Sequence, residues 1–170
     1  MMLSLFWWLV AAWFWWVVLR LLFREPDVCI GGVENPYLKR WYIMPRNPLF
    51  NIYLHQFLRD DDDRALHDHP WASISFVLRG KYMEFQPEMH IRRVGNIIFR
   101  RATHAHRIAL FKRAEYRMDE KHVMHHLPAW TLFITGPKVR EWGFHCPQGW
   151  RPWQVFCDPK DSTKIGRGCE

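Results

Sequence analysis

The chain has 170 residues, a length that suits one domain with a genuine core and leaves no room for two. Hydrophobic residues make up 49% and charged residues 24%, which excludes a disordered or collagen-like chain. The net charge of +7 fits an anionic partner, but Lys and Arg form no block or stripe, so we expect no nucleic-acid partner. The four cysteines include no CxxC pair, which excludes a zinc ribbon and argues against a disulfide scaffold.

The chain opens with an apolar run that no polar residue interrupts from Leu5 to Leu19. A helix over residues 3–23 would be about 30 Å long at about 1.5 Å per residue, close to the hydrocarbon thickness of a bilayer. We therefore predict that residues 1–24 form one hydrophobic helix that anchors the protein in a membrane. Arg20 and Arg24 follow the run and no basic side chain precedes it, so the positive-inside tendency places the remaining chain in the cytoplasm.

Other uses of this apolar segment stay open. The helix can instead pack on its own domain or on a second copy in a homo-oligomer, which would make the protein a soluble cytoplasmic one. The true start codon can also lie downstream of the segment. A secretory signal peptide fits less well, because the sequence has neither a basic n-region nor a small-x-small cleavage site.

From residue 25 on, short apolar and aromatic runs alternate with turn residues, which predicts an all-β domain over residues 25–157. Residues 158–170 are expected to form a flexible tail. Ten strands are expected, at Leu38–Met44, Phe50–Leu58, Ala72–Leu78, Lys81–Phe85, Met89–Val94, Asn96–Arg100, Arg107–Leu110, Ala129–Thr135, Arg140–His145 and Pro152–Phe156. Many short strands spaced by about ten residues are typical of a jelly-roll sandwich or barrel.

Two histidine pairs are the most informative feature of this domain. His67 and His69 flank one residue, and His104 and His106 do the same further along the chain. Side chains two residues apart on a strand point to the same face, so each pair would project its imidazoles side by side. Paired imidazoles are common ligands of divalent transition metals. Asp68 would point away from such a site.

The spacing of these residues resembles the two motifs of the cupin superfamily, G-x5-HxH-x3/4-E-x6-G and G-x5-PxG-x2-H-x3-N. His67, His69 and Gly80 match the first motif, and Gly95 and His106 match the second. The chain from about residue 35 is also similar to small cupin-like proteins of bacteria and phages. The resemblance implies a cupin-type jelly-roll β-barrel and a single divalent metal held by His67, His69 and His106.

The sequence also departs from the cupin pattern. Ser73 stands where the family has a glutamate ligand, and the remaining departures are Asp61, Arg101, Thr103 and Leu110. His104 lies two residues before His106 and would point to the same face of a strand. It is therefore a candidate fourth ligand or a base beside the metal. Trp71, Ser73 and Ser75 share the parity of the first pair and are expected to line the cavity.

The missing carboxylate has a chemical consequence. Three neutral imidazoles leave a divalent ion with its full charge, which attracts a small anionic or easily deprotonated ligand. Fe(II) is the metal we favour, although Mn, Ni and Zn accept the same ligands.

Two functions follow for such a site. Cupins with three histidine ligands include thiol dioxygenases, so the resemblance implies a metal-dependent, dioxygenase-like enzyme acting on a small anionic or thiol substrate, whose catalytic residues are unknown. The alternative is a non-catalytic metal- or small-ligand-binding module with a structural or regulatory role. Cys146 lacks an orienting acid beside it and is expected to be a buried small residue rather than a nucleophile.

Overall fold

The computed structural model describes residues 7–9, 11–12, 15, 23–61, 65–116, 122–160 and 166–170. The strands in these ranges are β1 (Val28–Ile30), β2 (Leu38–Tyr42), β3 (Asn51–Phe57), β4 (Leu66–His67), β5 (Ser73–Arg79), β6 (Lys81–Phe85), β7 (Met89–Arg93), β8 (Ile97–Arg100), β9 (Arg107–Leu110), β10 (Lys112–Tyr116), β11 (His122–His126), β12 (Ala129–Thr135), β13 (Gly143–Cys146) and β14 (Gly149–Pro152). One short helix, α2, spans Trp153–Phe156. The expected predominance of β-structure is confirmed.

A six-stranded antiparallel sheet forms the largest layer, with the order β1-β2-β3-β12-β5-β8. The central strand β12 pairs with β3 on one side and with β5 on the other. Its residues alternate, so that Ala129, Thr131 and Phe133 are buried while the residues between them are less so. This two-residue period directs one face of the sheet to the interior.

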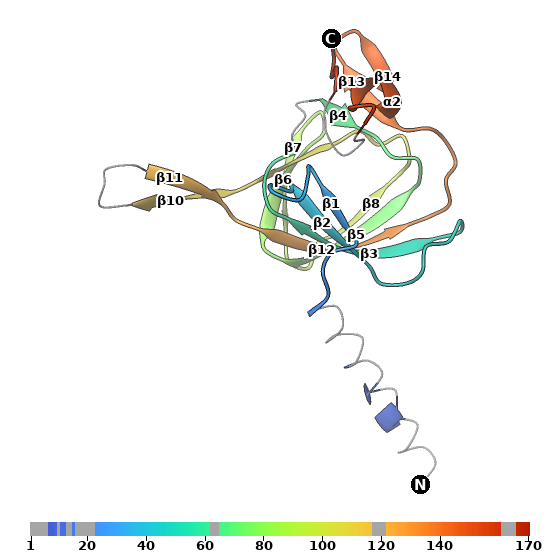
Figure 1. Ribbon diagram of the computed structural model, residues 1–170, viewed down its shortest axis with the longest axis vertical. Helices are drawn as coiled ribbons and strands as arrows, with labels where there is room; N and C mark the ends of the chain where they lie inside the picture. The colour runs from blue at the N-terminus through green and yellow to red at the C-terminus, as the bar shows by residue number, and fades with distance from the viewer. Residues whose placement is uncertain are drawn as a thin grey trace.

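Two three-stranded sheets, β7-β6-β9 and β14-β13-β4, complete the body of the domain. The strands surround a common interior, and β4, β13 and β14 gather at the end that holds the C-terminus (Figure 1). Buried residues from several of these sheets form one core cluster: Leu38, Phe57, Val77, Tyr82, Ile98, Ile108, Leu110 and Ala129. Among the described strands, the large sheet ends at β1 and β8 without pairing further. The expected β-barrel is therefore wrong in one respect: the described strands form separate sheets and do not close into a barrel.

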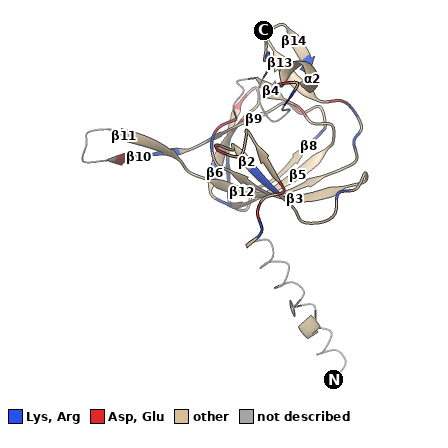
Figure 2. Ribbon diagram, in the orientation of Figure 1, with Lys and Arg blue, Asp and Glu red and all other residues tan. Residues whose placement is uncertain are grey.

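The β10–β11 hairpin projects away from this body (Figure 1) and, within the described strands, pairs only with itself. Lys and Arg lie on several separate elements with Asp and Glu between them (Figure 2).

The expected strand at Pro152–Phe156 is wrong. β14 ends at Pro152, and Trp153–Phe156 form α2, closed by a hydrogen bond of 2.8 Å from the Cys157 N–H to the Trp153 carbonyl. The Phe156 ring stacks on Phe144 of β13, with 3.6 Å between the ring centroids. Tertiary packing against β13 therefore overrides the strand propensity of this aromatic segment.

The amino-terminal prediction also needs correction. Most of residues 1–24 lies outside the described residues, and no helix in the described part of the chain is long and apolar enough to cross a membrane. This finding overturns the predicted transmembrane helix and the membrane as a partner.

A disulfide joins Cys146 of β13 to Cys169, across 23 positions of the sequence. The sequence analysis argued only against a disulfide scaffold and did not predict this single bridge of Cys146. The N–H groups of Gly166 and Gly168 donate to the Phe156 carbonyl at 3.0 and 3.1 Å, which holds these C-terminal residues at the end of α2. Residues 161–165 of the expected flexible tail lie outside the described residues.

Candidate metal centre

A cavity of about 70 Å³ lies inside the sheets and is lined by the three histidines His67, His69 and His106. Aromatic side chains, among them Trp71 and Phe133, supply further walls. The metal-binding nitrogens of the three histidines all lie within 4.8 Å of one another. The imidazoles thus converge on one point of a small, partly open cavity.

Backbone pairing brings these histidines together from distant parts of the sequence. His67 and His106 form an antiparallel bridge in which each N–H donates to the carbonyl of the other at 2.9 Å. The His69 N–H donates to the Ala102 carbonyl at 3.2 Å, which holds His69 beside the segment that leads from β8 to His106. These backbone bonds hold His67, at the end of β4, and His69, in the segment after it, beside His106.

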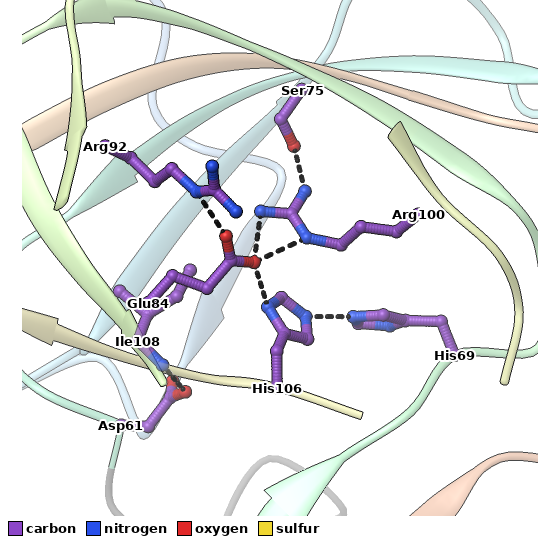
Figure 3. Close-up of polar contacts among 8 residues, drawn as sticks. All are labelled: Asp61, His69, Ser75, Glu84, Arg92, Arg100, His106 and Ile108. Carbon is purple, nitrogen blue, oxygen red and sulfur yellow. Dashed lines mark hydrogen bonds and ion pairs between the residues drawn. The ribbon is translucent and has the colours of Figure 1, made fainter. Parts of the chain in front are cut away.

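The three rings are poised to act as neutral ligands. Burial lowers the pKa of His67, and it lowers the pKa of His69 well below the usual value. Burial also lowers the pKa of His106, to about 3, although the Glu84 carboxylate opposes this shift. The Nε2 atoms of His69 and His106 face each other at 2.9 Å (Figure 3). Neutral imidazoles keep the lone pairs that a metal requires.

A buried carboxylate orients one of these rings. Glu84 of β6 is fully buried, and its Oε1 accepts a hydrogen bond of 2.8 Å from His106 Nδ1 (Figure 3). Its two oxygens also accept bonds of 2.6 Å from Arg100 Nε and Arg92 Nε. Burial alone would raise the pKa of Glu84, but the hydrogen bond from His106 and the nearby Arg100 charge outweigh it and lower the pKa.

The Glu84–His106 bond places the proton on Nδ1, so the lone pair of Nε2, which faces His69 Nε2, is the one that a metal would use. This carboxylate–histidine arrangement is common behind metal-binding imidazoles. The sequence analysis did not identify Glu84. The alternation of β6, in which Tyr82 and Glu84 are both buried, is the signal that could have placed it in the interior.

A second basic group in the cavity has no acidic partner in the part of the chain that the structure describes. Arg40 of β2 lines the cavity, and its Nε donates a hydrogen bond of 2.9 Å to His55 Nε2. Its guanidinium lies over the Tyr53 ring, 4.9 Å from the centroid. Burial lowers the pKa of Arg40, and burial together with the Arg40 charge lowers the pKa of His55 well below its usual value. Among the described residues no carboxylate forms an ion pair with Arg40, so the cavity offers a cation to an anionic ligand.

The structure brings together three of the four predicted ligands. His104 lies outside this convergent group, with its ring centroid 6.1 Å from that of His106, and it does not line the cavity. Trp71 and Ser75 line the cavity as expected from their parity. Ser73 is buried on the same face of β5 but lines a different cavity.

Asp68 points away from the three histidines, as its parity predicts, but it is buried rather than solvated. Only 1% of it is exposed. Its carboxylate accepts hydrogen bonds from the side chains of Arg140 at 2.8 Å, Trp150 at 3.0 Å and His145 at 3.1 Å. The backbone N–H of Gly143 donates to it at 2.9 Å. Asp68 thus ties the histidine segment to β13 and β14.

Comparisons with known proteins concern the fold. No protein-family model matches the chain, and no curated protein matches it significantly. A double-stranded β-helix protein from Klebsiella pneumoniae is 12% identical, and the match covers 66% of this chain and 88% of that one with a TM-score of 0.46. A cupin-2 domain protein from Shewanella frigidimarina is 12% identical, with 60% and 83% covered and a TM-score of 0.43. The DMSP lyase DddQ from Ruegeria pomeroyi is 12% identical, with 74% and 61% covered and a TM-score of 0.49.

The names of the first two neighbours describe a double-stranded β-helix domain and a cupin-2 domain, in agreement with the cupin resemblance of the sequence. At such low identity the likeness concerns the fold alone. One neighbour bears the name of an enzyme, the DMSP lyase, and that activity is stated of that protein.

Proposed function

We propose that the protein binds one divalent transition metal through His67, His69 and His106, and that this centre acts on a small anionic molecule. The observation that carries the proposal is the convergence of three imidazoles, that of His106 buried and those of His67 and His69 partly buried, whose ligand atoms lie within 4.8 Å of one another. The hydrogen bonding of His67 also fits a role as a metal ligand. His67 Nδ1 is buried and has no hydrogen-bond partner among the described residues, so His67 is not held by a competing contact at that atom.

The charge of the cavity supports an anionic substrate. A divalent ion held by three neutral imidazoles keeps its full charge, and when bound it would supply a Lewis acid for a carboxylate, thiolate or hydroxide. Arg40 adds a guanidinium on the same cavity that has no acidic partner among the described residues. A volume of about 70 Å³ limits the substrate to a few heavy atoms unless the walls move.

For the reaction we propose dioxygenase-like chemistry with Fe(II), on a small thiol that also carries a carboxylate. In this proposal Arg40 binds the carboxylate, and Trp71 and Phe133 exclude bulk water from the cavity. Glu84 holds the proton on His106 Nδ1, so that the ligand nitrogen stays unprotonated throughout. Imidazole ligands do not discriminate Fe(II) from Mn, Ni or Zn, so the choice of metal is part of the proposal.

The second candidate is a non-catalytic metal- or ligand-binding module. The small volume of the cavity favours it, because a structural ion needs no space for a substrate. A structural ion stabilises the fold outright, so its removal by a chelator would unfold the domain. A catalytic ion would leave by the same treatment with the fold retained.

Oxygen consumption by the Fe(II)-loaded chain tests the proposed reaction. We expect uptake with 3-mercaptopropionate and much less with 2-mercaptoethanol, which lacks the carboxylate. His69→Ala should abolish uptake in the same assay. No uptake by the loaded chain with either thiol would overturn the enzymatic proposal, and chelation followed by circular dichroism would then test the structural one.

A further inference from the structure

The six-stranded sheet has two faces, and only one of them lines the metal cavity. Arg40, His55 and Phe133 project into the cavity from β2, β3 and β12. Because side chains alternate along a strand, the residues between them project to the opposite side, which we call the outer face of the sheet. This outer face takes no part in the proposed metal centre.

Apolar side chains form two rows across the outer face. The strand register places the first row on five neighbouring strands: Trp41, Leu54, Leu132, Phe76 and Ile97. The second row lies beside it on four of these strands: Ile52, Ile134, Ile74 and Phe99. An antiparallel sheet with one face on a core and the other in water normally alternates apolar with polar residues. Here both faces carry apolar side chains, so the outer face is not built for water.

The outer face is uncovered in the described part of the chain. Phe99 and Ile97 of the edge strand β8 are 73% and 57% exposed. The other members of the two rows are half-buried, except Trp41, which is buried. The helix α2 packs on β13 and β14, and the described residues between 7 and 15 lie away from the sheet (Figure 1). An exposed apolar surface of this extent marks an interface with another protein.

A third row gives this surface a polar border. Trp130 and Leu78 continue the apolar area on β12 and β5, whereas Lys39 and Gln56 stand at the same level on β2 and β3. An apolar centre with a polar rim is the usual composition of a protein interface.

The size of the outer face fits a dimer. Five strands about 4.8 Å apart, with three outward residues about 6.8 Å apart on each, give a footprint of about 500 Å². Two such footprints amount to about 1,000 Å², the lower limit for a specific interface between proteins. The side chains rise above this flat footprint, so the area removed from water is greater.

A second copy of the chain matches this face in chemistry. The two rows hold no charged side chain, so a charged or polar partner surface would lose its hydration there without gaining a partner. A two-fold axis brings the same apolar rows of a second copy opposite the first, and each copy then buries the rows of the other. Sheets that pack face to face in this way lie about 10 Å apart.

We propose that the protein forms a two-fold symmetric dimer through the outer faces of its six-stranded sheets. Phe76, Leu132 and Ile134 lie in the middle of this interface, and the second copy covers Ile97 and Phe99. The metal cavity lies on the opposite face, so the dimer does not depend on the function proposed for that cavity.

Sedimentation equilibrium of the full chain between about 1 and 200 μM tests the dimer. We expect twice the chain mass of 20.7 kDa at the upper end of this range. The double variant Ile97→Lys/Phe99→Lys should raise the dissociation constant at least about tenfold, because dimerisation would bury two ammonium groups of each chain without partners. Val139→Lys is the matched control, since Val139 is 67% exposed and lies outside the strands. Its dissociation constant should stay within about twofold of the parent.

Two further variants locate the interface. Leu78→Lys, at a position of the outer face that is 50% exposed, should also weaken the dimer, and it replaces the double variant if that one loses the circular dichroism of the parent. Trp8→Lys changes a residue of the N-terminal segment that is 75% exposed, and it should leave the dimer intact. A parent that stays monomeric up to about 200 μM, equal dissociation constants for the outer-face variants and Val139→Lys, or a monomeric Trp8→Lys would each overturn the proposal.

Discussion

Glu84 of β6 and His106 are joined by a hydrogen bond of 2.8 Å between the carboxylate Oε1 and the ring Nδ1. The cupin motif that the sequence resembles has a glutamate ligand at the position of Ser73. In this chain a glutamate from a different strand stands behind a histidine instead. Its negative charge is already shared with Arg92 and Arg100, which leaves the charge of a bound metal for a substrate anion.

Glu84→Gln should weaken metal binding by about 10–100-fold, because a neutral amide no longer holds the His106 ring and its proton as firmly. The same variant should lower the free energy of unfolding by about 3 kcal/mol, since Arg100 is left buried without its partner. Competition with a chelator gives the affinity, and urea unfolding gives the stability. Glu88→Gln, exposed in the next turn, is the control. Equal metal affinity in both variants would show that Glu84 does not orient His106 for metal binding.

Arg40→Gln should raise the KM for a thiol carboxylate by about 10–100-fold, because a charge-assisted hydrogen bond to the substrate is lost. The KM for a neutral thiol of similar size should change little. Arg46→Gln, on an exposed part of the chain near β2, is the control. Steady-state oxygen uptake measures these values, and a KM that rises equally for both thiols would show that Arg40 does not recognise the carboxylate.

Asp68 should make the stability of the protein depend on acid pH. Burial alone would raise its pKa, but the bonds from Arg140 and Gly143 outweigh burial and lower the pKa below the ordinary value of 3.8. A lowered pKa in the folded state stabilises the fold above about pH 4, and this contribution is lost as the pH falls further.

Asp68→Asn should therefore lower the free energy of unfolding by about 2 kcal/mol at pH 7. The difference from the parent should shrink as the pH falls from about 5 to 2. Urea unfolding across this range measures it, with Glu34→Gln as the exposed control. A difference that stays constant with pH would contradict the role of the Asp68 charge.

The Cys146–Cys169 disulfide closes 23 positions of sequence, for which chain entropy predicts a stabilisation of about 3 kcal/mol. The double variant Cys146→Ala/Cys169→Ala should lose this amount in urea unfolding. The reductant dithiothreitol should destabilise the parent and have no effect on the double variant. Cys29→Ala, which removes a free cysteine, is the control. Dithiothreitol that leaves the parent unchanged would argue against this disulfide in solution.

Local patterns predicted the parts of the structure that depend on local geometry. The alternation of β3, β5 and β12 appears in the sequence as apolar and small residues at every second position, and their expected positions agree with the structure within one residue. His67 and His69 reach the same site, as the two-residue period predicts, although only His67 lies in a strand, β4, and His69 is held by its backbone bond to Ala102.

Contacts between residues that are far apart in the chain could not be predicted from the sequence. Glu84 reaches His106 from 22 positions away, and Arg40 reaches His55 across the β2–β3 pair. Nothing in the spacing of Cys146 and Cys169 indicates that the chain returns through Gly166 and Gly168. The helix at Trp153–Phe156 likewise depends on packing against Phe144 rather than on its own propensity.

Metal content of the full chain, purified without added metal and measured by elemental analysis, is the most direct test of the metal centre. We expect close to one divalent ion per chain in the parent, because the described residues provide one convergent set of histidines. His67→Ala and His106→Ala should each lower occupancy at least about tenfold, whereas His104→Ala, which removes a histidine outside the convergent set, should retain it. Full occupancy in the double variant His67→Ala/His106→Ala would contradict the ligand assignment.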